Sequence, residues 1–413
     1  MKTVFHLAPA LLALALAATT VRAQNPVRGD TVPRPRTPLL GTVAGDTARA
    51  GTVRVCAGGD VTLGTNLNAG WVHTASRKYG IPVEPFPDPD SLVAPLRPLV
   101  ADADVVLLNV EGAIGDGPPS RRKCAPGSTA CFAFRMQPEA AGALRRVADG
   151  AEVVGNVANN HAGDAGRPGW RDTMSRLRAA GVHVTGADTV PTVVVTARGD
   201  TVAFLGFSVW IGPDARDLAA VRRIVGRAAE RYPRLVVTMH MGAEGRAAQR
   251  TPNAPETFYG ENRGNMVAFA RAAATAGADL VVGHGPHVMR AAEWHGETLV
   301  LYSLGNLLTY GPFSLAEPLN RGAVACAALD STGRVVEAAL RPTRQVPPGR
   351  VLPDLTSRAV ALTDSLSRLD FPGSAARFEP DGAIVVPAPR TEGLRVRKVS
   401  PREAREPRRA GGS

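Results

Sequence analysis

Several short motifs that mark large enzyme classes are absent from this sequence. It has no GxxxxGK[ST] loop, no GxGxxG, no GxSxG and no HExxH. These absences argue against a P-loop nucleotide site, dinucleotide-dependent hydride transfer, a serine hydrolase with a nucleophile elbow and a zincin-type peptidase. Beyond the first 25 residues, no apolar run is long enough to span a bilayer.

Charge is nearly balanced in the body of the chain, although the 413 residues together carry a net charge of +11. Residues 1–23 contribute +2, residues 24–50 another +2 and the tail from Arg390 onward +5, which leaves +2 for everything between. The basic character therefore belongs to the flanks, and no nucleic-acid-binding motif accompanies it. We expect no nucleic-acid partner.

The N-terminus has the features of a secretory signal. Lys2 provides a positive start, Leu7–Ala18 is mostly apolar, and Val21–Ala23 ends on a small residue suited to cleavage. An uncleaved membrane anchor is the alternative, since Val4–Val21 is barely long enough to span. In either case we expect an exported protein that is periplasmic, extracellular or anchored to the outer face of the inner membrane.

Cysteine is rare, and its four residues allow three pairings. Cys124 and Cys131 flank a short loop of Pro, Gly, Ser and Thr, which favours a local disulfide in an exported protein. Cys56 and Cys326 lie in apolar strand-like runs. They are either two buried thiols or a second bridge, which would require their strands to be neighbours. The spacing lacks any CxxC, which argues against a zinc–thiolate site.

From Thr52 onward, apolar strand-like runs alternate with amphipathic segments, which predicts an α/β domain. The principal strands are expected at Val53–Ala57, Asp104–Asn109, Glu152–Asn156, Leu235–His240, Leu280–Gly283, Leu299–Leu304, Gly322–Leu329 and Val335–Pro342. We divide the chain into a signal peptide (1–23), a disordered Pro/Arg-rich linker (24–50), the α/β domain (51–345), a peripheral extension with one helix (346–389) and a basic disordered tail (390–413).

Polar residues cluster directly after these runs, where α/β folds place their sites. The clusters are Gly58-Gly59-Asp60, Asn109 with Glu111, Asn159-Asn160-His161 with Asp164, His240 with Glu244, His284-Gly285-Pro286-His287, and Tyr302–Asn306. Each alone could be a tight turn or a helix cap. Together they combine imidazoles with carboxylates and amides, the ligands that Zn²⁺, Mn²⁺ or Fe ions accept, so we expect one or two divalent metal ions.

The same clusters, in this order, resemble the bacterial capsule synthesis protein family CapA, which is associated with poly-γ-glutamate. That family has a GD after the first strand, then N-x-E, NNH with D-x-G, H-x-G-x-E, GH-x-PH and YSLGN. All six occur here between about residues 53 and 310. The resemblance implies a more distant relationship to the calcineurin-like metallophosphoesterases. It therefore implies an α/β/β/α sandwich, in which two sheets are packed together and flanked by helices.

The resemblance also implies roles for individual residues. The implied metal ligands are Asp60, Glu111, Asn160, His240, His284 and His287. His161 is expected to donate a proton to the reacting group without binding metal, and Glu244 to orient a ligand. The residues expected to contact substrate are Asn109, Asn159 and Asn306. Two positions differ from the phosphoesterase pattern, because Thr62 stands where D-x-H has its histidine and Glu111 replaces an aspartate.

These observations predict an exported metal-dependent hydrolase of capsule or poly-γ-glutamate synthesis or processing. Its substrate would be an anionic cell-surface polymer, and membrane-bound synthesis machinery is a candidate partner. Two alternatives stay open. One is a non-catalytic polymer-handling or export component, which the missing imidazole at Thr62 favours, and the other is a periplasmic phosphoesterase.

Overall fold

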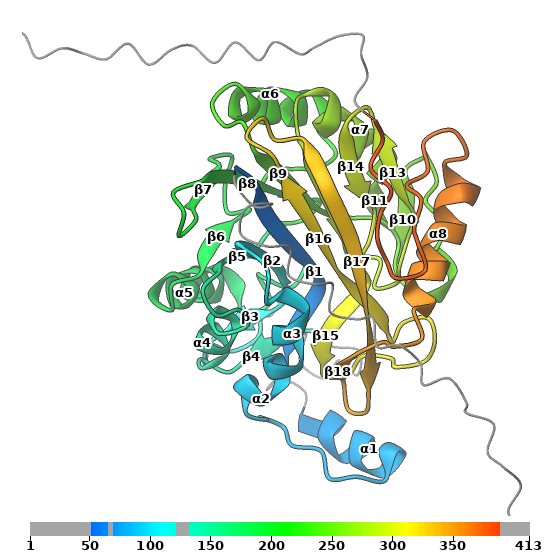
Figure 1. Ribbon diagram of the computed structural model, residues 1–413. Coiled ribbons are helices and arrows are strands. Elements are labelled where there is room, and N and C mark those ends of the chain that lie inside the picture. Colours follow the sequence, from blue (N-terminus) through cyan, green and yellow to red (C-terminus); the bar gives the residue numbers. More distant parts are fainter. Residues whose placement is uncertain (1–50, 65–68, 121–131, 389–413) are drawn as a thin grey trace, which may run out of the picture. The chain divides into compact units, whose positions relative to one another are not determined.

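The computed structural model describes residues 51–64, 69–120 and 132–388, which belong to one compact unit. The expected signal peptide, linker, basic tail and Cys124–Cys131 bridge lie outside the described residues. Two large sheets form the centre of this unit (Figure 1).

The first sheet has the order β18-β17-β16-β1-β2-β5-β6, with β15 beside the C-terminal part of β1. Its strands are β1 (Val53–Leu63), β2 (Val105–Val110), β5 (Glu152–Asn156), β6 (His183–Thr185), β15 (Asn306–Tyr310), β16 (Arg321–Leu329), β17 (Val335–Val346) and β18 (Arg350–Pro353). The second sheet has the order β13-β14-β12-β9-β8-β7. Its strands are β7 (Thr192–Val195), β8 (Thr201–Ser208), β9 (Leu235–His240), β12 (Leu280–His284), β13 (Ala292–His295) and β14 (Thr298–Leu301).

Short elements complete the described chain. Two small ribbons pair β3 (Ala113–Ile114) with β4 (Arg135–Met136) and β10 (Glu256–Phe258) with β11 (Glu261–Gly264). The helices are α1 (Ala69–Tyr79), α2 (Pro89–Val93), η2 (Ala94–Leu96), α3 (Arg97–Val100), α4 (Ala140–Arg145), α5 (Gly166–Ala179), α6 (Leu218–Ala229), η3 (Arg246–Ala248), α7 (Met266–Thr275) and α8 (Arg358–Asp370). Within the described ranges, none of these helices is long and apolar enough to span a membrane.

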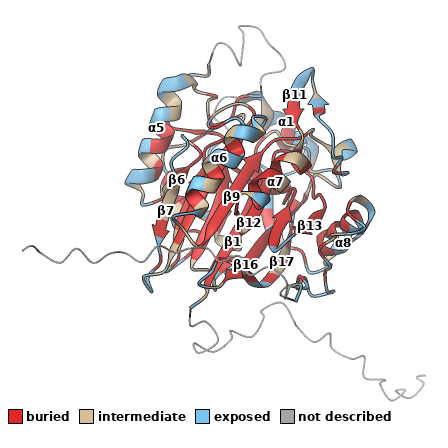
Figure 2. Ribbon diagram, turned by 90° about the horizontal axis from the view of Figure 1, so that it is seen from above, coloured by how far each residue is buried: buried red, intermediate tan, exposed pale blue. Residues whose placement is uncertain are grey.

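Alternating apolar residues of the strands build three cores between four layers. In β9, Val236 faces the first sheet, whereas its neighbour Val237 faces helices α6 and α7. In β1, Val55 contributes to the core between the sheets, and Cys56 contributes to the core beneath α2, α4 and α5. Figure 2 shows the result, with buried strands at the centre and helices whose outer faces are exposed. The expected α/β/β/α sandwich is confirmed.

Two segments differ from the expected organisation. The run Leu299–Leu304 is not a single strand, because the chain leaves the second sheet after Leu301 and joins β1 of the first sheet at Asn306. The segment after residue 345 is not simply peripheral. Strand β18 extends the first sheet, and Ala359 and Ser367 of α8 are fully buried. An apolar run in the sequence predicts that a segment is buried but does not predict which sheet it joins. Both differences have this cause.

A disulfide joins Cys56 of β1 to Cys326 of β16. The two residues face each other in an antiparallel pair with Cα atoms 4.0 Å apart, and both side chains are buried. Of the two possibilities that the sequence left open for this pair, the bridge is the one observed. It closes a loop across 270 residues and thereby links the first strand of the sandwich to a late one.

We expect reduction of this bridge to lower the free energy of unfolding by about 2–4 kcal/mol, because the unfolded chain gains conformational freedom. The measurement is guanidinium denaturation with and without reductant, in a Cys124→Ser/Cys131→Ser background. The matched control adds Cys56→Ala and Cys326→Ala, and its stability should not respond to reductant. Equal denaturation midpoints for the bridged protein under both conditions would contradict the prediction.

Candidate metal centre

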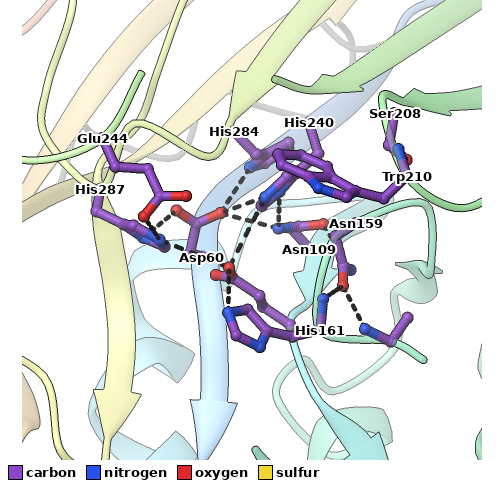
Figure 3. Close-up of polar contacts among 12 residues, drawn as sticks. Asp60, Asn109, Asn159, His161, Ser208, Trp210, His240, Glu244, His284 and His287 are labelled. Carbon is purple, nitrogen blue, oxygen red and sulfur yellow. Dashed lines mark hydrogen bonds and ion pairs between the residues drawn. The ribbon is translucent and has the colours of Figure 1, made fainter. Parts of the chain in front are cut away.

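The site lies where strands of both sheets end, as Figure 3 shows around Asp60. Asp60 in β1 is paired with Asn109 in β2, and Glu111 follows β2 directly. In the second sheet, His240 ends β9 and is paired with His284, which ends β12. The fold therefore brings carboxylates from one sheet next to imidazoles from the other.

Close backbone contacts explain two of the glycines in these motifs. A Cβ atom at Gly59 would lie 2.1 Å from the carbonyl oxygen of Gly305, and one at Gly283 would lie 2.0 Å from that of Tyr302. Any side chain at either position would displace the backbone that carries Asp60 or His284. Glycine is thus required for the approach of the Tyr302–Asn306 segment, which is where the chain passes from one sheet to the other.

Asp60, Glu111 and His287 form a group of potential metal ligands, which we call the donor group, with one ligand atom from each within 4.8 Å of the others. His287 Nδ1 lies 3.1 Å from Asp60 Oδ2, and its Nε2 lies 3.6 Å from Glu111 Oε1. His240 Nε2 is 3.8 Å from the same Glu111 oxygen, and His284 Nδ1 is 3.7 Å from Asp60 Oδ1. The ring of His287 is placed by a left-handed backbone conformation with φ 58°, which is uncommon outside glycine.

These residues fit a divalent metal ion. Both ring nitrogens of His284 and Nε2 of His240 are buried and have no hydrogen-bond partner among the described residues. Buried polar atoms are normally satisfied, and an absent ion is one recognised reason why they are not. Imidazole nitrogens beside carboxylate oxygens are the ligand set that Zn²⁺, Mn²⁺ and Fe ions share.

The electrostatics of the cluster favour the protonation states that metal ligands need. Burial lowers the pKa of His284 to about 4 against the opposing effect of Asp60, and burial also holds the pKa of His240 well below its ordinary value. Burial would raise the pKa of Asp60, but the hydrogen bond and positive charge of His287, with His240 and His284, lower it. Neutral imidazoles and an ionised carboxylate are the forms that bind metal.

His287 behaves differently from the other two imidazoles. Burial opposes its charge, but the carboxylates of Glu111, Asp60 and Glu244 together raise its pKa well above the ordinary value. Its Nδ1 also lies 2.9 Å from Asn306 Oδ1. These carboxylates therefore favour the protonated form of His287.

The asparagines expected to contact substrate are instead bonded inside the protein. Asn109 Nδ2 donates to Asp60 Oδ1 at 2.8 Å, and Asn109 Oδ1 accepts from Asn156 Nδ2 at 2.9 Å. Asn159 Oδ1 accepts from the backbone N–H groups of His161 and Ala162. The amide of Asn306 bonds His287 and the carbonyl of Leu319. Because Asn109, Asn159 and Asn306 are buried with these partners, they position the site residues rather than face a substrate.

His161 is held by a carboxylate outside the donor group. Its Nδ1 lies 2.7 Å from Asp164 Oδ2, and the ring of Phe134 packs over it with centroids 4.3 Å apart. Its Nε2 lies 3.9 Å from Glu111 Oε1 and so faces the centre. Asp164 is accordingly an orienting residue to which the sequence assigned no role, although D-x-G was part of the motif. Asn160 precedes His161 on the same turn and is partly exposed.

Glu244 lies at the rim of the centre. Its Oε2 is 3.9 Å from His287 Nε2, and its other oxygen accepts from Arg263 Nη1. Arg263 is buried and packs over Trp210, whose ring contacts that of His240 edge-on with centroids 5.6 Å apart. The sequence offered no signal for Arg263, because β11 is too short to show a periodic pattern.

Thr62 lies on β1, two residues beyond Asp60, and is 1% exposed. Its hydroxyl has no hydrogen-bond partner among the described residues. The position that differs from the phosphoesterase pattern is therefore buried near the centre without an imidazole.

Comparison with known proteins identifies the family of this arrangement. The profile of the family described as "Bacterial capsule synthesis protein PGA_cap" matches residues 54–310. "Capsule biosynthesis protein CapA" of Bacillus anthracis is 28% identical over 175 residues, and "PGA biosynthesis protein CapA" of Bacillus subtilis (strain 168) is 28% identical over 176 residues. These matches cover 40% and 38% of this chain and only 42% of each relative's length.

Solved structures with a similar arrangement are distant. The 5'-nucleotidase precursor from Thermus thermophilus has a TM-score of 0.36 and 14% identity, over 77% of this chain and 59% of that one. The NAD nucleotidase of Haemophilus influenzae has a TM-score of 0.32 and 10% identity, over 76% of this chain and 55% of that one.

Proposed function

The chain belongs to the bacterial capsule synthesis protein family PGA_cap, and from this premise we propose that it is an exported, metal-dependent hydrolase acting on an anionic capsule polymer. A capsule-related role follows from the family. One of the Bacillus relatives is described as a PGA biosynthesis protein, which makes poly-γ-glutamate the first polymer to test. The observation that carries the hydrolase proposal is the buried donor group of Asp60, Glu111 and His287 at the junction of two sheets.

We assign the following roles to the residues of the centre. Asp60, Glu111, Asn160, His240, His284 and His287 would hold one or two ions. Bound there, a divalent ion would supply Lewis-acid polarisation of a substrate oxygen. His161, whose Nε2 faces the centre, would donate a proton to the leaving group while Asp164 keeps the ring oriented. Arg263 would hold Glu244 beside His287, so that Glu244 keeps that ring in place.

A specific observation also favours a second candidate, a non-catalytic component that handles or exports the polymer. Thr62 places a hydroxyl where related phosphoesterases carry a histidine, and this removes one imidazole donor. With that metal position weakened, the same fold would bind the anionic polymer without hydrolysing it. Metal content and turnover on the same preparation decide between the two candidates.

Removing a residue that only supports a metal ligand typically lowers metal affinity by about 10–100-fold. His284 and Asn160 are proposed as ligands themselves, so His284→Ala and Asn160→Ala are each expected to lower metal affinity at least as much. The measurement is elemental analysis of purified protein after loading with Mn²⁺, Zn²⁺ or Fe²⁺. His295→Ala, at the far end of β13, is the matched control and should bind metal as the wild type does.

The same preparations test the reaction class. Cleavage of a γ-glutamyl oligomer without turnover of an aryl phosphate would support the polymer hydrolase, and the reverse result would favour a phosphoesterase. If the wild-type protein binds no metal under any loading condition, the hydrolase proposal fails and the non-catalytic candidate replaces it.

A further inference from the structure

A cavity of about 820 Å³ opens beside the metal centre, and none of the roles above uses it. Its lining combines cationic side chains with aromatic and aliphatic ones: Arg167, Trp170, Arg171, Trp210 and Ile211. The volume lies within the range of about 300–1,000 Å³ that is usual for ligand sites. The cavity therefore has room for a segment of substrate rather than a single small ion.

The cavity wall touches the catalytic end of the fold at two points. Trp210 contacts the ring of His240 (Figure 3). Ile211 packs against the turn that follows His161, because a Cβ atom at Gly163 would lie 2.6 Å from Ile211 Cδ1. A chain bound in the cavity would thus lie next to the metal centre.

The positive charges of the cavity have no acidic partner among the described residues. Arg167 and Arg171 lie four residues apart near the start of α5, which places them on one face of that helix, and both are exposed. Neither forms an ion pair with any residue that the structure describes. By contrast, Arg176 on the same helix lies 2.9 Å from Asp172. Two unpaired guanidinium groups beside each other are suited to bind oxyanions such as carboxylates.

The apolar part of the cavity is held rigidly. Ser208 Oγ accepts from the backbone N–H groups of Trp210 and Ile211 at 3.1 and 2.9 Å. The guanidinium carbon of Arg263 lies 4.5 Å from the Trp210 ring centroid, and Trp210 Nε1 donates to Glu261 at 3.3 Å. Aromatic surface fixed in this way can pack against methylene groups at a reduced cost in side-chain ordering.

We propose that this cavity binds the polymer on one side of the bond to be cleaved. Arg167 and Arg171 bind carboxylates, and Trp210 and Ile211 pack against the methylene groups between them. A γ-glutamyl unit has one carboxylate and two methylene groups, which matches this alternation of charge and apolar surface. The inference rests on the proposed function in two respects, which are the identity of the polymer and the location of the bond to be cleaved at the metal centre.

The test is isothermal titration of the full-length protein with a γ-glutamyl oligomer. Arg167→Gln and Arg171→Gln should each weaken binding by at least about tenfold, because each removes a charge-assisted hydrogen bond. Arg178→Gln is the matched control, since Arg178 is exposed in the last turn of the same helix and lies outside the cavity lining. Its affinity should equal that of the wild type.

Equal affinity for all three variants and the wild type, or equal weakening by all three, would overturn the proposal. Tighter binding of a polyphosphate of the same length, lost in the same two variants, would overturn the assignment to carboxylates. Arginine-dependent binding of the oligomer by a metal-loaded protein that never cleaves it would support the subsite and overturn the hydrolase. The two proposals therefore fail separately.

Discussion

Replacing His161 by alanine is expected to lower turnover by about 10²–10⁴-fold, the usual contribution of a general acid, and to leave metal content unchanged. The structure distinguishes His161 from the other imidazoles, because its Nδ1 lies 2.7 Å from Asp164 Oδ2, outside the donor group, while its Nε2 lies 3.9 Å from Glu111 Oε1. The measurement is kcat and metal stoichiometry on the same preparation of protein.

Asp164→Asn is the companion variant for His161. It keeps the shape of the side chain but removes the charge that stabilises a protonated ring, so turnover should fall by less than in His161→Ala while metal content stays the same. If His161→Ala loses metal as His284→Ala does, His161 is a ligand and the division of roles is wrong.

Arg290→Met is expected to lower the free energy of unfolding by about 3–5 kcal/mol, because it leaves a buried carboxylate without its partner. Arg290 is 0% exposed and forms two hydrogen bonds with Glu256, at 2.8 and 2.7 Å. Its Nε and Nη2 also donate to the carbonyl oxygens of Ala248 and Ala243. Arg290 thereby ties down the loop that carries Glu244. Chemical denaturation measures the effect.

Two controls accompany this prediction. Arg290→Met/Glu256→Gln removes both charges and should recover part of the lost stability. Arg146→Met breaks an ion pair with Asp90 in which both side chains are well exposed, at 54% and 36%, so its effect should stay within the range of about 0–1 kcal/mol that is usual for such pairs. A loss in Arg290→Met no larger than that in Arg146→Met would contradict the prediction.

The place of the centre could be predicted from the sequence, because parallel strands in one sheet end at the same edge. Asp60 and Asn109 are paired neighbours in one sheet, and His240 and His284 are paired neighbours in the other. The motif order alone did not reveal that the two pairs belong to different sheets. The strand-end pattern thus located the donors but not the architecture that brings them together.

The remaining features depend on contacts between distant segments. The Cys56–Cys326 bridge requires a strand register set across 270 residues, which no local pattern contains. The family resemblance implied that Asn109 contacts substrate, but it did not show that the neighbouring amides of Asn156 and Asn159 hydrogen-bond to its side chain. Trp210 reaches His240 only after β8 and β9 have paired. Such contacts are set by how segments that are distant in the sequence pair and pack in the fold.

The donors of the centre come from two sheets, and this origin would link the ion selectivity of the proposed metal site to the packing of the core. Val55, Leu107, Val236 and Val282 lie between the sheets on the strands that carry Asp60, Asn109, His240 and His284. Their volumes set the local spacing of the sheets, which is about 10 Å in packed sheets generally. A larger or smaller side chain there would move the carboxylates relative to the imidazoles. If the centre binds a divalent ion as we propose, discrimination among ions, which follows from ligand geometry, would be partly determined by residues that never touch the ion.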